Sequence, residues 1–175
     1  MNQSSRRPSD PLEAAVAMLA RRPYSVAEMR RALEKKFGGG PPVRAAVARL
    51  RELGYLNDKK FAALYASSLA RNRAFGSHRI RRELKAKLVD YKYIEPALGQ
   101  AFEEVDEHGL LERALAKKIK TLRRPVTPAR IYSLCQSLMR QGFRSDDIMK
   151  AVRSRPELKP GAEDVDPEAL DQDKE

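Results

Sequence analysis

A pattern that returns every 51 residues constrains this chain more than any other feature of its sequence. Shifting the sequence by 51 positions superposes apolar residues that are four apart, as on one face of a helix. The superposed sets are Met29, Ile80 and Ile131; Leu33, Leu84 and Cys135; and Phe37, Leu88 and Met139. Arg22, Arg73 and Arg124 also superpose, each directly before a turn. This joint agreement indicates three tandem copies of one unit.

Each copy is predicted to hold three helices, because helical apolar patterns are dense and strand signals are almost absent. The first helices are expected at about 10–22, 57–73 and 106–124, the second at 25–37, 77–88 and 127–141, and the third at 42–53, 91–104 and 145–154. Suitable N-caps are Ser25, Asn57-Asp58, Asp106 and Thr127. Further core positions are Leu12, Ala15, Val16, Leu19, Val43, Val47, Leu50, Ile94, Leu98, Ile148 and Val152.

A three-helix unit of this size buries little surface alone, and stacking of copies extends the core. We therefore predict an all-α fold of three tandem three-helix repeats in an elongated or curved array. The repeats are expected at residues 10–55, 56–105 and 106–154. Residues 1–9 and the acidic segment 155–175 are expected to be disordered, because they are rich in Ser, Pro or acidic residues.

The net charge of +11 is distributed unevenly along the chain. Residues 157–175 carry −6, which leaves +17 on residues 1–156. Such an excess favours a polyanionic partner, because Lys and Arg that contact phosphates release condensed counterions. The acidic segment either increases solubility or competes within the chain for the basic surface.

Side chains suited to catalysis are sparse. His78 and His108 lie in different copies without a nearby cysteine, so both are expected at the surface and not in a metal site. Cys135 is the single cysteine and is expected to be buried and inert. Gly38-Gly39-Gly40 lacks the strand and the Gly-Lys-Ser/Thr of a phosphate loop, so it is read as a helix stop. We predict no enzyme, no cofactor and no metal. Without a secretory signal or an apolar run of membrane-spanning length, a cytoplasmic location is expected.

The predicted helix 77–88 combines the apolar stripe Ile80, Leu84 and Leu88 with a net charge of +4. Only Glu83 offsets its basic residues, so binding of phosphate or of an acidic protein surface is favoured over a merely solvated face. Few side chains near its start could read bases, which favours backbone or protein contacts. The candidate DNA- or filament-binding residues are Arg71, Arg73, Arg79, Arg81, Arg82, Lys85 and Lys87, with secondary contacts at Arg30, Arg31, Lys35, Arg123 and Arg124. The aromatic residues Tyr55, Tyr65, Phe75, Tyr91 and Tyr93 either stack on bases or pack at core edges.

Two blocks of the sequence resemble the RecX family of regulatory proteins. Leu53-Gly54-Tyr55-Leu56-Asn57-Asp58, with Phe61-Ala62 and Tyr65, resembles the LGYLDD…FA…Y signature of that family. His78-Arg79-Ile80-Arg81-Arg82-Glu83-Leu84, with Lys87 and Val89, resembles its RIRxELxxKGV block. The chain departs from the family at Leu88, where Gly is frequent, and at Phe75-Gly76-Ser77, where a Gly-x-Gly-Pro turn is frequent. The resemblance covers about residues 10–154.

The resemblance implies tandem three-helix repeats and a regulator that is not an enzyme. It implies binding to RecA and to the RecA filament on single-stranded DNA, typically with inhibition of strand exchange and of ATP hydrolysis by RecA. The DNA backbone is a further expected partner, and a monomer is expected. The alternative is a free-standing basic helical-repeat nucleic-acid-binding protein that acts without RecA. That protein would bind naked DNA with a steep dependence on salt.

Overall fold

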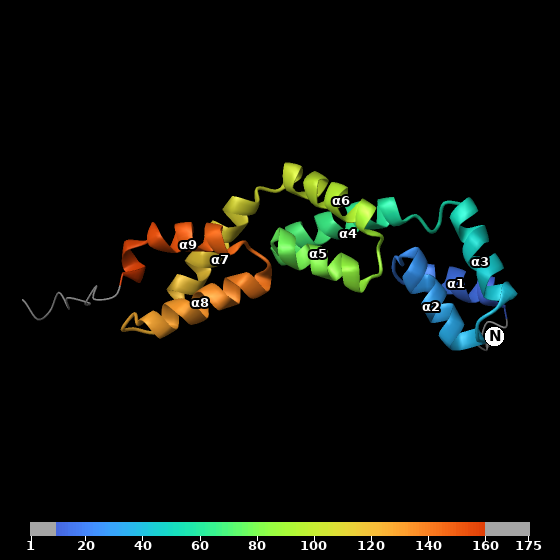
Figure 1. The fold of residues 1–175 in the computed structure, drawn as a ribbon, viewed down its shortest axis with the longest axis horizontal. Helices are drawn as coiled ribbons and strands as arrows, with labels where there is room; N and C mark the ends of the chain where they lie inside the picture. The colour runs from blue at the N-terminus through green and yellow to red at the C-terminus, as the bar shows by residue number, and fades with distance from the viewer. Residues whose placement is uncertain (1–9, 160–175) are drawn as a thin grey trace, which may run out of the picture. The chain divides into compact units, whose positions relative to one another are not determined.

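The computed structural model describes residues 10–159, and all regular structure in that range is helical (Figure 1). The nine α-helices in this range are α1 Pro11–Leu19, α2 Val26–Phe37, α3 Pro41–Glu52, α4 Asp58–Arg73, α5 Ser77–Ala86, α6 Tyr91–Glu104, α7 Glu107–Lys120, α8 Pro128–Gln141 and α9 Ser145–Arg153. The predicted all-α fold and helix order are confirmed. No helix in the described part of the chain is long and apolar enough to cross a membrane. The predictions for residues 1–9 and 160–175 lie outside the described residues.

The helices begin at the caps that the sequence predicts. The Ser25 hydroxyl accepts the N–H of Glu28 at 3.0 Å, and the Asp106 carboxylate accepts the N–H groups of the second and third residues that follow it, at 3.0 and 2.9 Å. Asn57 and Thr127 cap α4 and α8 in the same way. Each cap satisfies backbone donors that the first turn of a helix leaves unpaired.

Two helices end three or four residues earlier than predicted. The first ends at Leu19 and the seventh at Lys120, whereas residues 22 and 124 were expected. A proline follows both predicted ends, at Pro23 and Pro125. The residue before a proline is disfavoured in the helical conformation, so the chain turns before reaching it.

The contacts divide the described chain into two units. The first unit contains α1–α4, the part of α5 from Ile80 onward, and α6. The second unit contains Ala74–Arg79, which includes the first turn of α5, together with α7–α9. Each unit is described by itself below.

In the first unit, the core is formed by the positions that the repeat aligns. Met29 and Leu33 of α2, Ile80 and Leu84 of α5 and Ile94 of α6 all have no exposed surface. The remaining core predictions for α3 and α6 are also confirmed, since Val43, Val47, Leu50 and Leu98 are buried. In α1, Ala14 and Ala15 are buried, whereas Val16 is 52% exposed and was wrongly assigned to the core.

In the second unit, the burial pattern of α8 departs from the 51-residue register. Leu134 and Leu138 are buried with Cys135, whereas the predicted Ile131 and Met139 are only half-buried. Ile148 of α9 is 1% exposed, as predicted. α8 has 14 residues, whereas α5 has 10. The 51-residue register therefore aligns the first residues of these two helices, Ser77 and Pro128, but does not identify the most deeply buried residues of the longer helix.

The third repeat extends beyond the predicted boundary at residue 154. Residues 156–158 form a short 3-10 helix, and its Leu158 is only 3% exposed. Arg155 forms an ion pair with Glu112 of α7. Residues 155–159 therefore belong to the second unit and not to a disordered tail, because burying Leu158 stabilises their ordered conformation.

Among residues 10–159, two residues that are not glycine have left-handed backbone. Leu88 has φ 59° and Ala74 has φ 50°. For residues with a Cβ this conformation costs about 1–2 kcal/mol. Leu88 therefore lies outside α5, which ends at Ala86, and the prediction of Leu88 as part of a helical stripe is wrong. A glycine at position 88 would adopt this conformation without that cost.

Candidate functional site

The predicted basic residues in and before α5 have two kinds of surroundings. Arg71, Arg73, Arg82 and Lys85 are exposed, whereas Arg79, Arg81 and Lys87 are half-buried. The candidate surface thus consists of exposed cations beside cations that hold helices together.

Arg81 connects α5 to α6 within the first unit. Its Nε and Nη2 donate to the two carboxylate oxygens of Glu95 at 2.7 and 2.9 Å. These hydrogen bonds lower the pKa of Glu95, against an opposing effect of burial. A bidentate pair of this kind fixes the orientation of both side chains. Arg71 is also paired, with Glu104 of α6. Both arginines therefore stabilise the packing of the second repeat.

Lys87 connects the turn after α5 to α2. Its Nζ donates to Glu28 Oε1 at 3.0 Å, and Arg22 donates to both carboxylate oxygens of Glu28 at 3.0 and 3.1 Å. Burial raises the pKa of Glu28, but the hydrogen bonds from Arg22 and Lys87 outweigh it, so the pKa lies below its usual value of 4.5. Lys87 is therefore a link between the first and second repeats.

The start of α2 is bound by residues of the second repeat. Ser25, which is fully buried, donates its hydroxyl to the carbonyl of Lys87. The N–H of Val26, the first residue of α2, donates to Asp58 Oδ1 at 2.8 Å. Asp58 is the first residue of α4, so a negative charge lies at the N-terminus of α2, where the helix dipole favours it.

The same joint recurs in the second unit, 51 residues later. The N–H of Ser77, the first residue of α5, donates to Glu107 Oε1 at 2.6 Å. The N–H groups of Gly76 and His78 donate to the carbonyls of Gln141 and Gly142 at 2.9 and 3.1 Å. In both joints, the N-terminus of the second helix of one repeat contacts two parts of the next repeat. One is an acidic residue near the start of that repeat, and the other is the turn that follows the second helix of that repeat.

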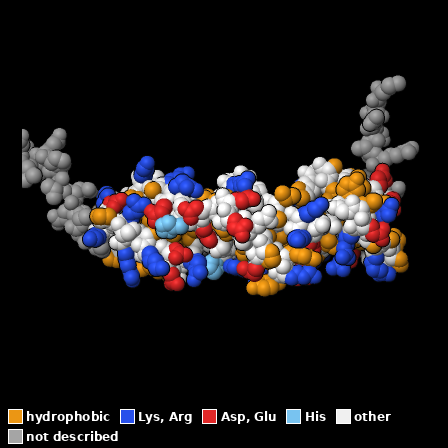
Figure 2. Space-filling view, turned by 90° about the horizontal axis from the view of Figure 1, so that it is seen from above, with side chains coloured by type: hydrophobic (Ala, Val, Ile, Leu, Met, Phe, Trp, Pro, Cys, Tyr) orange, Lys and Arg blue, Asp and Glu red, His pale blue; other side chains and the backbone are white. Residues whose placement is uncertain are grey.

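The exposed cations of α5 lie beside an exposed aromatic ring. Lys85 Nζ lies 5.8 Å from the centroid of the Tyr91 ring, and Tyr91 is 62% exposed. Tyr91 does not pack at a core edge, so it is available to a partner. On α2, the predicted secondary residues Arg30, Arg31 and Lys35 are exposed as well. Figure 2 shows Lys and Arg side chains interspersed with Asp and Glu on the face that it displays.

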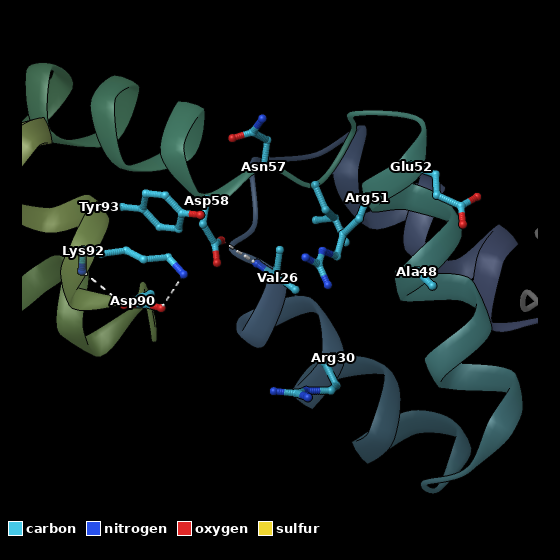
Figure 3. Close-up of a pocket in the computed structure, with 11 residues that line it drawn as sticks. Val26, Arg30, Ala48, Arg51, Glu52, Asn57, Asp58, Asp90, Lys92 and Tyr93 are labelled. Atoms are coloured by element: carbon cyan, nitrogen blue, oxygen red, sulfur yellow. Dashed lines mark hydrogen bonds and ion pairs between the residues drawn. The ribbon is translucent and has the colours of Figure 1, made fainter.

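A cavity of the first unit has mixed charge. It has a volume of about 730 Å³ and is lined by residues of α2, α3, α4 and α6 (Figure 3). The cations Arg30, Arg51 and Lys92 line it together with three acids, among them Asp58 and Asp90. Lys92 Nζ lies 3.1 Å from Asp90 Oδ2, and Asp58 is turned toward the start of α2. With this balance of charge the cavity has no preference for an anion.

The remaining candidates for chemistry lie where the sequence predicts them. His78 and His108 are exposed, and Cys135 is buried. Burial raises the pKa of the Cys135 thiol, which keeps it protonated and unreactive. Within residues 10–159, no three His, Cys, Asp or Glu side chains are grouped as metal ligands.

The sequence predictions missed a cationic pocket in the second unit, between α7 and α8. Lys118 and Arg130 line it, together with Arg123, which was predicted only as a secondary contact. Arg124, the other secondary residue, donates to the carbonyl of Glu157 at 3.4 Å. A signal was available in the sequence, because residues 113–145 contain no acidic residue.

Together, these features define an all-helical protein that is built of three-helix repeats and has exposed cations on its surface. A family model described as "RecX, second three-helix domain" matches residues 57–98. The regulatory protein RecX of Chlorobaculum tepidum is 32% identical over 146 residues, which cover 83% of this chain and 88% of that protein. That of Trichlorobacter lovleyi is 28% identical over 145 residues, covering 82% and 94%. The chain belongs to the RecX family of regulatory proteins.

A solved structure has the same fold. The crystal structure of RecX from Lactobacillus salivarius matches with a TM-score of 0.71 at 19% identity, covering 82% of this chain and 93% of that one. RecX proteins modulate RecA and are not enzymes. The prediction of a non-enzymatic RecA modulator is therefore confirmed through the family.

Proposed function

We propose that this chain inhibits RecA by binding the RecA filament on single-stranded DNA through the exposed cations of α5. The observation that carries the proposal is that Arg82 and Lys85 are exposed on a helix of net charge +3. Within the first unit, Arg81 pairs with Glu95 of α6 and Lys87 pairs with Glu28 of α2, so Arg82 and Lys85 are presented on a fixed support. Cations on a rigid element lose little freedom on binding an anionic surface. The chain acts as a monomer in the cytoplasm, and it contacts the DNA backbone as well as RecA.

The candidate residues are ranked as contacts by their exposure and by the ion pairs that they form. Arg73, Arg82 and Lys85 are the primary contacts because they are exposed. Arg71, Arg81 and Lys87 act indirectly, since their ion pairs hold α4, α5 and α2 in place. Arg79 lies with its guanidinium carbon 5.2 Å from the centroid of the Phe75 ring and is half-buried, which makes it a supporting residue. The secondary contacts are Arg30, Arg31, Lys35, Arg123 and Arg124.

The proposal is tested by the ATPase rate of RecA on circular single-stranded DNA. Substoichiometric amounts of the chain should lower the steady-state rate. The double variant Arg82→Gln/Lys85→Gln should need about tenfold more protein for half inhibition, because two exposed charge contacts contribute roughly 1.4 kcal/mol together. The matched control is Lys59→Gln/Lys60→Gln, which removes two exposed cations from α4.

Three outcomes would contradict the proposal. An unchanged ATPase rate at equimolar protein would remove the inhibitory function, and an increased rate would reverse its direction. If the two double variants lose inhibition of the RecA ATPase equally, the net charge of the protein, and not the position of the cations on α5, determines binding.

A further inference from the structure

We infer that the second unit contains a separate pocket for the phosphate backbone of a single-stranded nucleic acid, between the end of α7 and the start of α8. The pocket lies outside the α5 surface on which the proposed function depends, and it contains Arg123, one of the secondary contacts of that proposal. Its ligand chemistry, a chain of phosphodiesters, follows from the cations and hydroxyl groups that line it.

The pocket lies in the longest acid-free stretch of the chain. Residues 113–145 contain no Asp or Glu. Their basic residues are Arg113, Lys117, Lys118, Lys120, Arg123, Arg124, Arg130, Arg140 and Arg144. Like charges at this density repel one another, and the repulsion is relieved when a polyanion binds. The packing of α7 and α8 does not require this excess, because the core of the unit consists of leucines such as Leu115 and Leu138.

Three cations of this stretch meet at one pocket. Lys118, Arg123 and Arg130 line a cavity of about 330 Å³ together with the hydroxyl-bearing Thr121, Ser133 and Ser137. Ammonium, guanidinium and hydroxyl groups are the donors that phosphate oxygens accept. The volume is at the lower end of the range of small-ligand pockets, about 300–1,000 Å³.

Two of the cations are already held in position. Lys118 Nζ donates to Ser137 Oγ at 2.6 Å. Arg130 Nη1 donates to the carbonyl oxygens of Arg123, at 3.1 Å, and of Pro125. These contacts hold the α7–α8 turn against α8, so the pocket is preorganised and little ordering is needed when a ligand binds.

No carboxylate of residues 10–159 neutralises the cations of the pocket. Across residues 10–159, none of Lys118, Arg123 and Arg130 forms an ion pair with a carboxylate. The cavity of the first unit has a similar number of cations, but three acids lie among them. The pocket between α7 and α8 is therefore selective for anions, and the first cavity is not.

Exposed cations beyond the pocket favour a polymeric phosphate over free phosphate. A cationic surface longer than the pocket can contact several phosphates of one strand. The exposed Tyr132 lies on the opposite side of α8, about 160° from Arg130 and about 140° from Ser137, and takes no part in the pocket. Lys117, Lys120 and Arg124 are exposed nearby in the sequence and extend the cationic surface.

The test uses the full chain, a fluorescently labelled 15-nucleotide oligo-dT and fluorescence anisotropy over a range of salt concentrations. The double variant Lys118→Gln/Arg123→Gln should bind about tenfold more weakly at moderate salt. The slope of log K against log salt should fall by roughly 1.4, because each phosphate contact to a single strand contributes about 0.7. The matched control, Lys150→Gln/Arg153→Gln, removes two exposed cations from α9 of the same unit and should change the slope little. Unchanged circular dichroism spectra and unfolding midpoints verify that the variants fold.

Two further arms test the extent of the pocket and its ligand. Tyr132→Ala, a second control on the opposite side of α8, should leave both the affinity for oligo-dT and the salt slope unchanged. Inorganic phosphate should compete with oligo-dT only weakly, in the millimolar range or above. The inference is overturned if both double variants lose affinity equally. It is also overturned if Lys118→Gln/Arg123→Gln loses phosphate binding but keeps its affinity for oligo-dT. The assay contains no RecA, so its result is independent of the proposed action on the filament.

Discussion

Replacement of Gly76 by alanine should destabilise the joint between the start of α5 and the end of α8. A Cβ at this position would lie 2.5 Å from the carbonyl carbon and oxygen of Gly142 and 2.7 Å from the backbone nitrogen of Phe143. These neighbours are backbone atoms, so no side chain can rotate away to relieve the contact. The two segments must separate by about 1 Å to reach van der Waals distance.

The magnitude follows from the contacts that this separation breaks. Gly76 and His78 donate backbone hydrogen bonds to the carbonyls of Gln141 and Gly142, at 2.9 and 3.1 Å. Overpacking costs about 1–3 kcal/mol, and each weakened hydrogen bond costs about 1 kcal/mol. We expect Gly76→Ala to lower the free energy of unfolding by about 2–4 kcal/mol, because relaxation recovers part of the sum.

A matched control lies in α6. A Cβ at Gly99 would meet no atom within 4 Å, and Gly99 is exposed inside the helix. Gly99→Ala should therefore raise the free energy of unfolding by about 0.5–1 kcal/mol, through its higher helix propensity. Urea unfolding of the full chain, followed by circular dichroism, measures both variants. The reasoning is refuted if Gly76→Ala stays within about 0.5 kcal/mol of the wild type, or if Gly99→Ala loses as much stability as Gly76→Ala.

Three further predictions concern acid, backbone strain and the thiol. Because Arg22 and Lys87 hold the pKa of Glu28 below its usual value, Glu28 stabilises the fold above that value and loses this effect as the pH falls through its folded pKa. In urea unfolding at decreasing pH, the free energy of unfolding of Glu28→Gln should fall less than that of the wild type. An equal fall in both proteins would contradict the lowered pKa of Glu28. Ala74→Gly should raise the free energy of unfolding by about 0.5–1 kcal/mol, because it relieves a φ of 50° at some cost in unfolded-state entropy. A loss of stability would show that the Ala74 side chain contributes more than its backbone strain costs. Cys135 should react with iodoacetamide at least about tenfold more slowly in the native chain than in urea, since it is buried and its pKa is raised. Similar rates in the two states would contradict its burial.

The helices and most of the core could be predicted because both depend on local sequence. Apolar residues at helical spacing and caps such as Ser25 and Asp106 act within a few residues of one another. The 51-residue register places Met29 and Ile80 at equivalent, fully buried positions. In α8 the register fails to identify the deepest residues, because the longer helix buries Leu134 and Leu138. The repeat in the sequence therefore predicts the order of the helices better than it predicts which face of each helix is buried.

The candidate site was less predictable because its charges are paired across long distances in sequence. Lys87 meets Glu28 from 59 residues away, and Arg81 meets Glu95 from 14 residues away. The charge pattern of a single helix cannot show such partners, so exposed and internally paired cations look alike in the sequence. The pocket at Lys118 was missed for another reason. Its signal is the absence of acids over 33 residues, which no single helix displays.

The most direct test of the central claim compares the affinity of the chain for two forms of the same labelled single-stranded DNA. One form is naked, and the other is coated with RecA in the presence of a non-hydrolysable ATP analogue. A RecX-family regulator of RecA should bind the coated DNA at least about tenfold more tightly, because the filament adds protein contacts to the phosphate contacts. Equal affinity for both forms, or preference for the naked strand, would contradict the account and would indicate a nucleic-acid-binding protein that acts without RecA.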